Sequence, residues 1–477
     1  MGLVSRVLDP VTVATLSDYE AVGGGKALEA ARASEPVAVI EVVEASGLRG
    51  RGGAGFPTGV KWRTVAGMGG AQPATVVVNG AEGEPGTLKD RTLLRRNPYK
   101  VIEGALIAAH AVAADRVIIG MKRSAHREQA RVAGAIAEVV AAGWHQGISL
   151  ETVVGSDRYL LGEETALLEA ISGNPPFPRV APPYRDGAEE VGPDVSATAG
   201  TALADASGAT RAPATLVNNV ETMANVPAVV LDGPVVFRSL GTPESPGTMV
   251  CTVSGRTERA GVGEFEMGTP LREVIEVLGG GPLGGSIVAV LSGTANPFLP
   301  AAALDAPLTW EDLAKAGGGL GSAGFIVLDD GVDLVAVAEG VSRFLSVESC
   351  GQCTPCKDDG LTMAAILGRL RDSIPDADDL QLLPLLTDTV TQGARCFLAT
   401  QHQVVVKSLL SQFPDVVSAH AEGRAPAAEA FPIVPLLDIV DDQAVLALDE
   451  LDVSPDWQVG ADSGATPAER IDVRADR

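Results

Sequence analysis

The stretch TVVVNG at residues 75–80, followed by PYKVIEGALIAAHAVAA from Pro98 and RVIIGM at residues 116–121, decides the fold of the chain. TVVVNG and RVIIGM are short apolar runs rich in β-branched residues, which predicts two buried strands. The segment between them has helical spacing of its apolar residues and begins at a proline, a residue common in the first helical turn. A strand, a helix and a second strand predict a parallel pair with the helix on one face of the sheet.

The same alternation extends over residues 37–171. SAHREQARVAGAIAEVVAAG, which follows RVIIGM, predicts another helix with Ser124 as its N-cap. We therefore predict a multidomain α/β protein with a mainly parallel sheet. Short Val- and Ile-rich runs from residue 247 to 328 predict a small α+β domain, and helical spacing from residue 332 predicts a helical bundle.

These changes of pattern predict four parts. An α/β domain covers residues 1–240 and contains an insertion rich in Ala, Thr, Ser and Gly at residues 189–212. The α+β domain covers residues 246–331, and the helical bundle covers residues 332–425. Residues 426–477 are acidic with little periodicity, so we expect a loosely packed tail. A chain of 477 residues is long enough for several cores.

The composition excludes some classes of function. Because 46% of the residues are apolar and only 20% are charged, the chain is globular. The formal net charge of -25 disfavours nucleic acid and anionic membranes as partners. The opening MGLVSRVLDPVTV lacks a long apolar core, and we find no membrane-spanning stretch, so we expect a cytoplasmic protein.

Four of the five cysteines form one pattern, CGQCTPC at residues 350–356 followed by Cys396. Three thiolates three residues apart and a fourth from a distant helix are typical of a [4Fe-4S] cluster. A zinc site and unrelated core thiols remain as alternatives, although zinc more often takes two separate pairs of ligands. Cys251 lies in a strand-like run, which favours a buried apolar thiol.

Two glycine-rich segments indicate ligand contact. GLRGRGGAGFPTG at residues 47–59 interleaves glycines with two arginines and precedes Lys61, so its backbone can approach a phosphate or a flat ring closely. NGAEGEPG at residues 79–86 follows the first predicted strand, whose carboxyl end faces a ligand crevice in sheets of this kind. There Glu82 and Glu84 would meet ribose-like hydroxyls. A flexible loop and a solvated turn are the alternatives.

Two further segments carry weaker signals. LGEETALLE at residues 161–169 opens a predicted helix with two adjacent carboxylates, which the helix dipole alone favours. TLVNNVET at residues 215–222 offers two side-chain amides that can donate to and accept from a flavin ring or its ribityl chain.

Together these motifs resemble a known family. GLRGRGGAGFPTGVKW, NGAEGEPGTLKDR, GEETALLE, PATLVNNVETMANVP and ESCGQCTPC have the order and spacing of the 51 kDa flavoprotein family. This family is the NADH-binding subunit of respiratory complex I and the diaphorase subunit of soluble hydrogenases and NAD-dependent formate dehydrogenases. The resemblance runs from about Tyr19 to about Phe413. It implies a modified Rossmann-like FMN/NADH domain, a β-grasp domain of soluble-ligand-binding type, and a helical bundle that holds the iron-sulfur cluster.

The resemblance also implies the site residues. Lys61 and Glu164 would act on the flavin electrostatically, and the nucleotide would contact Phe56, Tyr184 and Glu84. The cluster ligands would be Cys350, Cys353, Cys356 and Cys396. The FMN contacts would be Gly50, Arg51, Gly52, Gly53, Lys61, Asn79, Glu82, Gly162, Glu163, Glu164, Asn218, Asn219 and Thr222.

Three positions depart from the family pattern. Ala81 stands where the family usually has Asp, which removes a polar contact to the flavin. Thr64 replaces an aromatic residue that follows the Lys-Trp pair, whereas Tyr184 in place of Phe keeps a ring beside the adenine. NAD specificity is therefore the property that these departures affect most.

The resemblance implies an activity. NADH gives up two electrons as hydride, a [4Fe-4S] cluster takes one at a time, and a flavin converts between the two. We expect NADH oxidation through FMN and the cluster, with electrons leaving to a [2Fe-2S] thioredoxin-like subunit and a multi-cluster iron-sulfur subunit. Such a complex would hold the chain at the inner face of the plasma membrane. The alternatives are a subunit of the Rnf ferredoxin:NAD complex, which Ala81 fits, and a scaffold that keeps the cluster without flavin.

Overall fold

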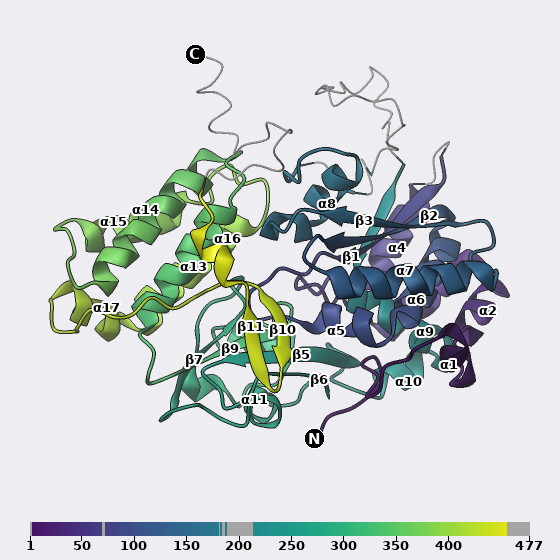
Figure 1. Cartoon of the computed structure of the whole chain (residues 1–477), viewed down its shortest axis with the longest axis horizontal. Helices are drawn as coiled ribbons and strands as arrows, with labels where there is room; N and C mark the ends of the chain where they lie inside the picture. Colours follow the sequence, from purple (N-terminus) through teal and green to yellow (C-terminus); the bar gives the residue numbers. More distant parts are fainter. Residues whose placement is uncertain (1, 69–71, 181, 184–186, 188–212, 456–477) are drawn as a thin grey trace, which may run out of the picture. The chain divides into compact units, whose positions relative to one another are not determined.

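The computed structural model describes residues 2–68, 72–180, 182–183, 187 and 213–455 (Figure 1). Tyr184, the predicted insertion and the end of the acidic tail lie outside the described residues. The chain divides into two compact units. The first unit comprises Met1–Glu82, Lys89–Val250 and Gly263–Gly268, and the second comprises Gly83–Leu88, Cys251–Val262 and Thr269–Arg477. The predicted four-part division stays a prediction.

The first unit contains a four-stranded sheet in which every pairing is parallel, so the predicted α/β fold with a parallel sheet is confirmed. Its strand order is β3 (Ser149–Gly155), β2 (Ala114–Lys122), β1 (Ala74–Gly80) and β4 (Thr215–Asn219). Strand β1 is central, and Val76, Val77 and Val78 are all fully buried. A continuous run of valines suits such a strand because helices cover both faces of a parallel sheet.

The helices of this unit follow from local signals. Helix α6 has Asn97 as N-cap, with its side chain accepting from Lys100 N, and Pro98 at its first position. It packs against α9, where a Cβ on Gly104 would lie 2.0 Å from the carbonyl oxygen of Met223, so the close approach requires glycine. The helices are α1 (Leu16–Ala21), α2 (Lys26–Arg32), α3 (Pro36–Ser46), α4 (Thr58–Gly67), α5 (Lys89–Arg96), α6 (Pro98–Val112), α7 (His126–Ala141), α8 (Glu164–Ile171), α9 (Val220–Asp232), α10 (Pro234–Arg238) and the 3-10 turn η1 (Tyr159–Gly162).

The predicted N-cap of helix α7 is wrong. Ala125, not Ser124, occupies the cap position, and no side chain caps the helix. The backbone N–H of Ser124 donates instead to Asp157 Oδ1 at 2.7 Å. The carboxylate of Asp157, which follows β3 in the sequence, therefore fixes this turn. The residues around Ser124 carry no signal of this contact.

The order of the strands creates a ligand position. From β1 the chain adds β2 and β3 on one side, and β4 then pairs with the other side of β1. In parallel sheets a crevice opens at the carboxyl ends of strands where the order reverses in this way. This rule predicts a ligand position between β1 and β4, where Asn79 is directly opposite Asn219.

A five-stranded sheet is built mostly from residues of the second unit. Parallel pairing joins β5 to β9, and antiparallel pairing joins β9 to β7 and β7 to β8. The strands that the Val- and Ile-rich runs predict in this region are confirmed. The strand order is β6 (Gly261–Glu266), β5 (Thr248–Gly255), β9 (Gly324–Asp329), β7 (Ile287–Ser292) and β8 (Leu299–Pro300), with α11 (Leu271–Gly279), α12 (Trp310–Lys315) and the 3-10 turn η2 (Ala301–Ala303) beside it.

The remainder of the second unit is mainly helical (Figure 1). Its helices are α13 (Leu334–Glu348), α14 (Thr354–Arg371), α15 (Asp379–Thr389), α16 (Leu398–Gln412) and α17 (Pro414–Ala421). The expectation of a loose tail is wrong for the residues that follow, because β10 (Leu436–Val440) and β11 (Gln443–Leu446) form an antiparallel hairpin, before the 3-10 turn η3 (Leu448–Asp452). None of the described helices is long and apolar enough to cross a membrane.

Candidate functional site

The four segments singled out in the sequence of the first unit meet at the carboxyl ends of β1 and β4. Asn79, at the end of β1, donates from Nδ2 to the carbonyl oxygen of Gly162 at 2.8 Å, which joins the second segment to the third. A Cβ on Gly52 would lie 3.2 Å from Asn219 Cβ, so the glycine-rich loop packs on the fourth segment. Residues 47–222 thus build one site from four separate motifs.

Lys61 and Glu164 form the charged part of this site. Lys61 Nζ donates to Glu164 Oε2 at 2.6 Å and to the carbonyl oxygen of Val217 at 2.9 Å. Their side chains are 26% and 39% exposed, so the pair is open to a ligand. Trp62, the next residue, is fully buried and donates from Nε1 to Asn218 Oδ1 at 2.9 Å, which fixes that amide.

Arg51 does not present its charge to a ligand. Its guanidinium is fully buried and donates to the carbonyl oxygens of Thr248 at 3.1 Å, Pro246 at 3.1 Å and Arg49 at 3.2 Å. Burial lowers the pKa of Arg51 to about 10. Its backbone N–H donates to Thr222 Oγ1 at 2.9 Å. The side chain of Arg51 therefore holds the loop in place, and a flavin contact can come only from its backbone.

A backbone hydrogen bond joins the two ends of the glycine-rich loop. Gly50 N donates to the carbonyl oxygen of Phe56 at 2.8 Å. Gly53 has a φ of 128°, a conformation that residues with a Cβ avoid. Phe56 is 53% exposed, so its ring is available to stack on a ligand. Thr64 uses its hydroxyl to donate to the carbonyl oxygen of Val60, one turn back in helix α4.

A buried charged network supports Asn219, and the sequence analysis missed it. Lys89 is 1% exposed, and its Nζ lies 2.8 Å from Asp90 Oδ1, 2.9 Å from Glu221 Oε2 and 3.3 Å from Asn219 Oδ1. Asn219 Nδ2 in turn donates to Asp90 Oδ2 at 2.6 Å. Both ends of the Asn219 amide are thereby oriented. The motif GTLKDR contained Lys89 and Asp90, but the polar sequence around them gives no signal that both are buried.

Burial and the neighbouring charges together set the pKa values of the groups in this network. Burial opposes the charged form of Lys89, but Asp90 and Glu221 outweigh it, so the pKa of Lys89 is raised. Burial raises the pKa of Glu221, while Lys89 and Arg51 act in the opposite direction. Each charge in the network therefore depends on its partner.

Two of the other predicted carboxylates, Glu82 and Glu163, bind helix N-termini. Glu82 accepts from the backbone N–H groups of Asp90 at 3.2 Å and Arg91 at 3.0 Å, at the start of α5. Glu163 caps α8 by accepting from Thr165 N at 3.0 Å and Ala166 N at 2.8 Å. Burial raises the pKa of both Glu82 and Glu163.

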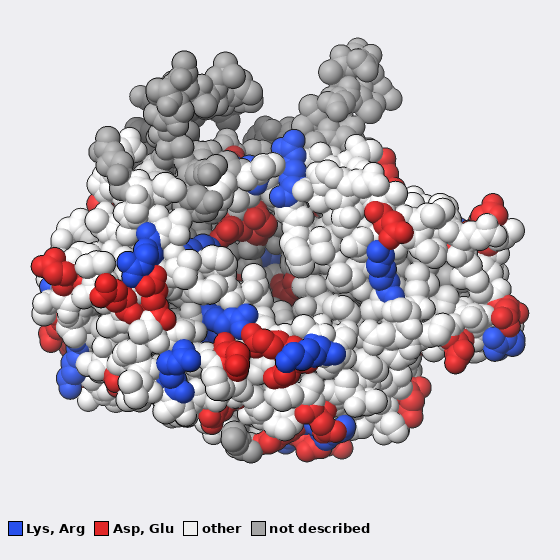
Figure 2. Space-filling view, turned by 180° about the vertical axis from the view of Figure 1, so that it is seen from behind, with Lys and Arg blue, Asp and Glu red and all other residues white. Residues whose placement is uncertain are grey.

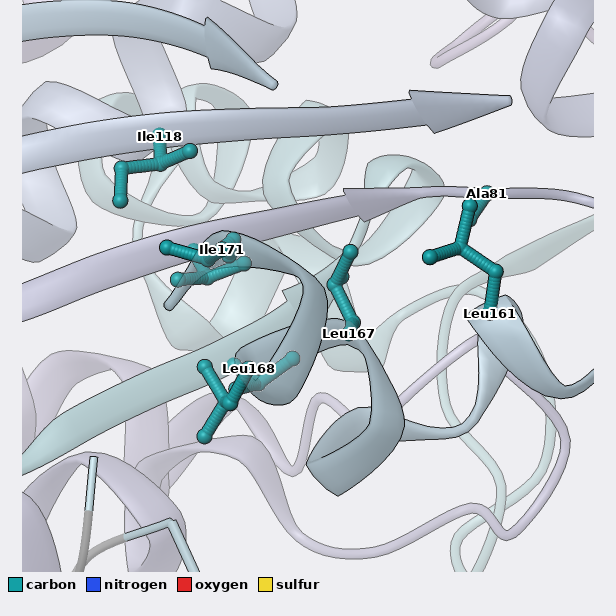
Figure 3. Close-up of a cluster of buried hydrophobic side chains, with 8 residues drawn as sticks. Ala81, Ile118, Leu161, Leu167, Leu168 and Ile171 are labelled. Atoms are coloured by element: carbon teal, nitrogen blue, oxygen red, sulfur yellow. The ribbon is translucent and has the colours of Figure 1, made fainter. Parts of the chain in front are cut away.

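Ala81 is part of an apolar cluster at the edge of the site (Figure 3). It is 2% exposed and packs with side chains from β1, β2, β4, η1 and α8. An aspartate at this position would place a charge among leucines and isoleucines, which is unfavourable without a partner. The apolar neighbours therefore match the alanine. The cluster comprises Val77, Ala81, Ile118, Leu161, Leu167, Leu168, Ile171 and Val217.

Glu84 and Tyr184, which were predicted to contact the nucleotide, are not among the residues that the hydrogen bonds above connect. Glu84 belongs to the second unit, where its Oε1 accepts from the hydroxyl of Thr294 at 2.9 Å and from the Thr294 backbone. Tyr184 lies outside the described residues. Both assignments stay predictions.

Three cysteines of the motif lie where α13 gives way to α14 in the second unit, and the loop that carries the fourth is linked to them. Cys350 follows α13 by two residues, Cys353 is the N-cap of α14, and Cys356 lies in the first turn of α14. Cys353 Sγ donates to the carbonyl oxygen of Gly393 at 3.4 Å, which places the loop before Cys396 beside them.

A second link joins the same loops. Gln352 Nε2 donates to Cys350 Sγ at 3.4 Å, and Arg395 Nη1 donates to Gln352 Oε1 at 3.2 Å. Because Arg395 is the neighbour of Cys396, this bridge brings the fourth cysteine toward the first. Burial raises the pKa of the Cys350 thiol, and it raises that of Cys356 to about 11.

The donor set fits an iron-sulfur cluster. Four thiols from two separate segments of the chain, two of them buried, are the ligands that such clusters take in proteins. As they stand, the described residues contain no group of three or more His, Cys, Asp or Glu side chains that could hold a single metal ion. A four-iron cluster does not require the thiolates to converge on one metal ion, because each thiolate binds a different iron. Cys251 is fully buried in β5, as predicted.

Charges of both signs are mixed on the surface. On the face shown in Figure 2, lysine and arginine side chains lie singly or beside acidic ones. Over the whole sequence 61 acidic residues outnumber 36 basic ones. This distribution offers no support for a nucleic-acid ligand.

Comparison with known proteins gives matches over both units. Residues 43–228 match the family model of the Nuo51 FMN-binding domain, and residues 336–420 match that of the NADH-ubiquinone oxidoreductase-F iron-sulfur binding region. The NADH-quinone oxidoreductase F subunit 2 of Rhizobium meliloti (strain 1021) is 35% identical over 422 residues, covering 86% of this chain and 95% of that protein. The F subunit of the same enzyme from Mycobacterium tuberculosis (strain ATCC 25618 / H37Rv) is 35% identical over 86% of this chain and 91% of its own.

A solved structure is also similar. The crystal structure of an NAD+-reducing [NiFe]-hydrogenase in the H2-reduced state contains a chain that superposes with a TM-score of 0.72 at 31% identity. The match covers 85% of this chain and 66% of the hydrogenase chain, so this chain spans just under two thirds of its length.

Proposed function

Because the chain belongs to the family of NADH-quinone oxidoreductase F subunits, we propose that it oxidises NADH with FMN and a [4Fe-4S] cluster and delivers the electrons to a partner protein. It is thus an NADH dehydrogenase component that works within a complex. The observation that carries this proposal is the meeting of four sequence motifs at the carboxyl ends of β1 and β4, together with four cysteines held by α13, α14 and the loop before α16.

The residues at β1 and β4 fit FMN. Gly52 lets the loop backbone lie against Asn219, and a side chain there would press on it. Asn79, Asn218 and Asn219 present amides whose orientation is fixed by hydrogen bonds to their neighbours, as recognition of a flavin ring and ribityl hydroxyls requires. The partly exposed Lys61 ammonium would supply positive charge for the phosphate or for the electron-rich reduced ring.

The chain itself needs no nucleophile for this reaction. Bound FMN would supply the hydride acceptor for NADH and the donor of single electrons to the cluster. Glu164 holds the Lys61 ammonium at 2.6 Å and so limits its approach to the flavin. The exposed ring of Phe56 would stack on the nucleotide, with Tyr184 on the same ligand and Glu84 near a ribose.

The finer architecture is part of the proposal. The second unit would combine a β-grasp domain, built on the five-stranded sheet, with a bundle of α13–α17 that holds the cluster. Cys350, Cys353, Cys356 and Cys396 would be its ligands. The amides and hydroxyls near these thiols would hydrogen-bond the cluster sulfurs.

The partners are inferred from the family. A [2Fe-2S] thioredoxin-like subunit and a multi-cluster iron-sulfur subunit would accept the electrons, with the complex at the inner face of the plasma membrane. The likeness to a chain of an NAD+-reducing hydrogenase supports a conversion between two-electron and one-electron transfer in this chain as well. It also leaves room for a final electron acceptor other than a quinone.

A visible spectrum tests the proposal. The full chain is produced anaerobically, alone and with candidate partner subunits, and NADH is added while the spectrum is recorded. We expect flavin bands above a broad iron-sulfur absorbance, and both should bleach with NADH. A preparation that holds iron and sulfide but takes up no flavin when FMN is supplied would overturn the proposal in favour of a non-catalytic iron-sulfur scaffold.

A further inference from the structure

Lys357 occupies an unusual position beside the cysteine motif. It follows Cys356 directly, yet its side chain is 1% exposed and turns away from solvent. Its Nζ donates to the carbonyl oxygens of Ser346 at 2.9 Å, Ser349 at 2.9 Å and Val347 at 3.4 Å. All three N–H groups of the ammonium thus have backbone acceptors in one turn of chain.

Those acceptors lie where α13 ends. The last carbonyls of a helix have no partners within it, and together they carry a partial negative charge. Helix α13 ends at Glu348, and the chain then runs through Ser349 into Cys350. The ammonium of Lys357, a residue of helix α14, donates hydrogen bonds to these carbonyl oxygens at the end of α13 and offsets their negative charge. It therefore links the turn that carries Cys350 to the helix that carries Cys356.

The positive charge of Lys357 also acts on the iron-sulfur cluster that the cysteines would hold. A cluster ligated by four thiolates is anionic, and one added electron makes it more so. Burial keeps water from screening a charge, so the Lys357 ammonium favours added negative charge nearby. Cys356 also lies at the N-terminal end of α14, whose dipole acts in the same direction.

We propose that Lys357 is a positioning residue that sets the reduction potential of the [4Fe-4S] cluster by holding a buried positive charge between α13 and α14. This proposal rests on the cluster assigned above and adds a residue that is not a ligand. Removing the charge makes the cluster harder to reduce. The step is the transfer of one electron from an added reductant, dithionite, to the oxidised cluster, with no bond made or broken.

The size of the effect follows from Coulomb's law. A residue next to a ligand places its charge on the order of 10 Å from the cluster, and at an effective dielectric constant of about 20 this changes the electron equilibrium about tenfold. For one electron, a tenfold change corresponds to about 59 mV. Replacing Lys357 with a neutral residue should shift the midpoint potential by about this amount, to more negative values.

The experiment is a redox titration of the full chain, followed by the electron paramagnetic resonance signal of the reduced cluster. Lys357→Met removes the charge and the donors, Lys357→Gln removes the charge and keeps N–H donors, and Lys357→Arg keeps the charge. Lys407→Met is the matched control, since it removes a lysine of helix α16 that is 47% exposed and pairs with Asp388 at 2.6 Å. Iron and sulfide are measured in every preparation.

We expect both neutral variants to have a more negative midpoint potential, with Lys357→Arg and Lys407→Met close to the wild type. An assembled neutral variant with the wild-type potential would overturn the inference. So would failure of both neutral variants to bind iron while Lys357→Arg assembles at the wild-type potential, because Lys357 would then be a structural cap only. Absence of a cluster from the wild-type chain would instead contradict the proposed function.

Discussion

Replacing Lys89 with methionine should destabilise the first unit strongly. The ammonium of Lys89 is buried with two carboxylates, Asp90 at 2.8 Å and Glu221 at 2.9 Å. Without it, both carboxylates stay buried next to one another without a cation. Breaking a buried ion pair from one side costs about 3–5 kcal/mol, and each kcal/mol lowers the melting temperature of a unit of this size by about 2–4 °C. The expected drop is therefore roughly 6–20 °C.

The loss should depend on pH. Burial already raises the pKa of Glu221 in the folded chain, and removal of Lys89 raises it further. The folded variant then binds a proton that the unfolded chain has released, so stability falls as the pH rises from the ordinary value of 4.5 through the folded pKa. The destabilisation should be smaller at pH 5 than at pH 8. Adding Glu221→Gln to Lys89→Met should recover part of it.

The assay is thermal unfolding of the flavin-free chain, followed by tryptophan fluorescence at several pH values. Arg116→Met is the control, because Arg116 pairs with Glu151 at 2.7 Å with 19% and 37% of the side chains exposed. A pair of this kind contributes about 0.2–1 kcal/mol. The reasoning is refuted if Lys89→Met loses no more stability than the control, or if its loss grows as the pH falls.

Three further predictions concern the cofactor sites and the core. Cys396→Ala should abolish the iron-sulfur absorbance and the bound iron, whereas Cys251→Ala should leave both unchanged, as iron analysis will show. Lys61→Met should weaken FMN binding at least tenfold by leaving Glu164 unpaired, whereas Glu164→Gln should preserve or tighten it; a fluorescence titration in which both weaken alike contradicts the assigned charges. His402 is fully buried and burial lowers its pKa to about 3, so the wild type should lose up to about 1.4 kcal/mol of stability per pH unit as the pH falls below 6.5, and denaturant titration of His402→Leu should lack that slope.

The sequence predicted the parts of the fold that depend on local pattern. The valines of β1 and the apolar spacing of α6 define those elements by themselves, and parallel pairing follows from their alternation. The meeting of Asn79 with Asn219 was predictable for the same reason. Both lie at the carboxyl ends of short buried strands, and the carboxyl ends of neighbouring parallel strands lie at one edge of a sheet.

Other features depend on partners far along the chain. The Arg51 side chain turns inward because Pro246 and Thr248 offer it carbonyl oxygens, 195 and 197 residues away. The hairpin after Leu436 was missed because its turn uses Asp441 and Asp442, both with positive φ, in place of the Asn-Gly or Asp-Gly pair that marks such turns.

The buried lysines show why the support of a site is harder to predict than the site itself. Residues that contact a cofactor recur in motifs, so Asn219 and Cys356 could be proposed as cofactor contacts from their neighbours in sequence. Lys89 reaches Asn219 across 130 residues, and Lys357 binds carbonyl oxygens that any residue would offer. Neither arrangement has a signature in the sequence, because both lysines stand beside aspartates in polar stretches. Yet a buried charge fixes both the orientation of an amide and the electrostatic potential around it, so these two lysines should control flavin affinity and cluster potential without touching either cofactor.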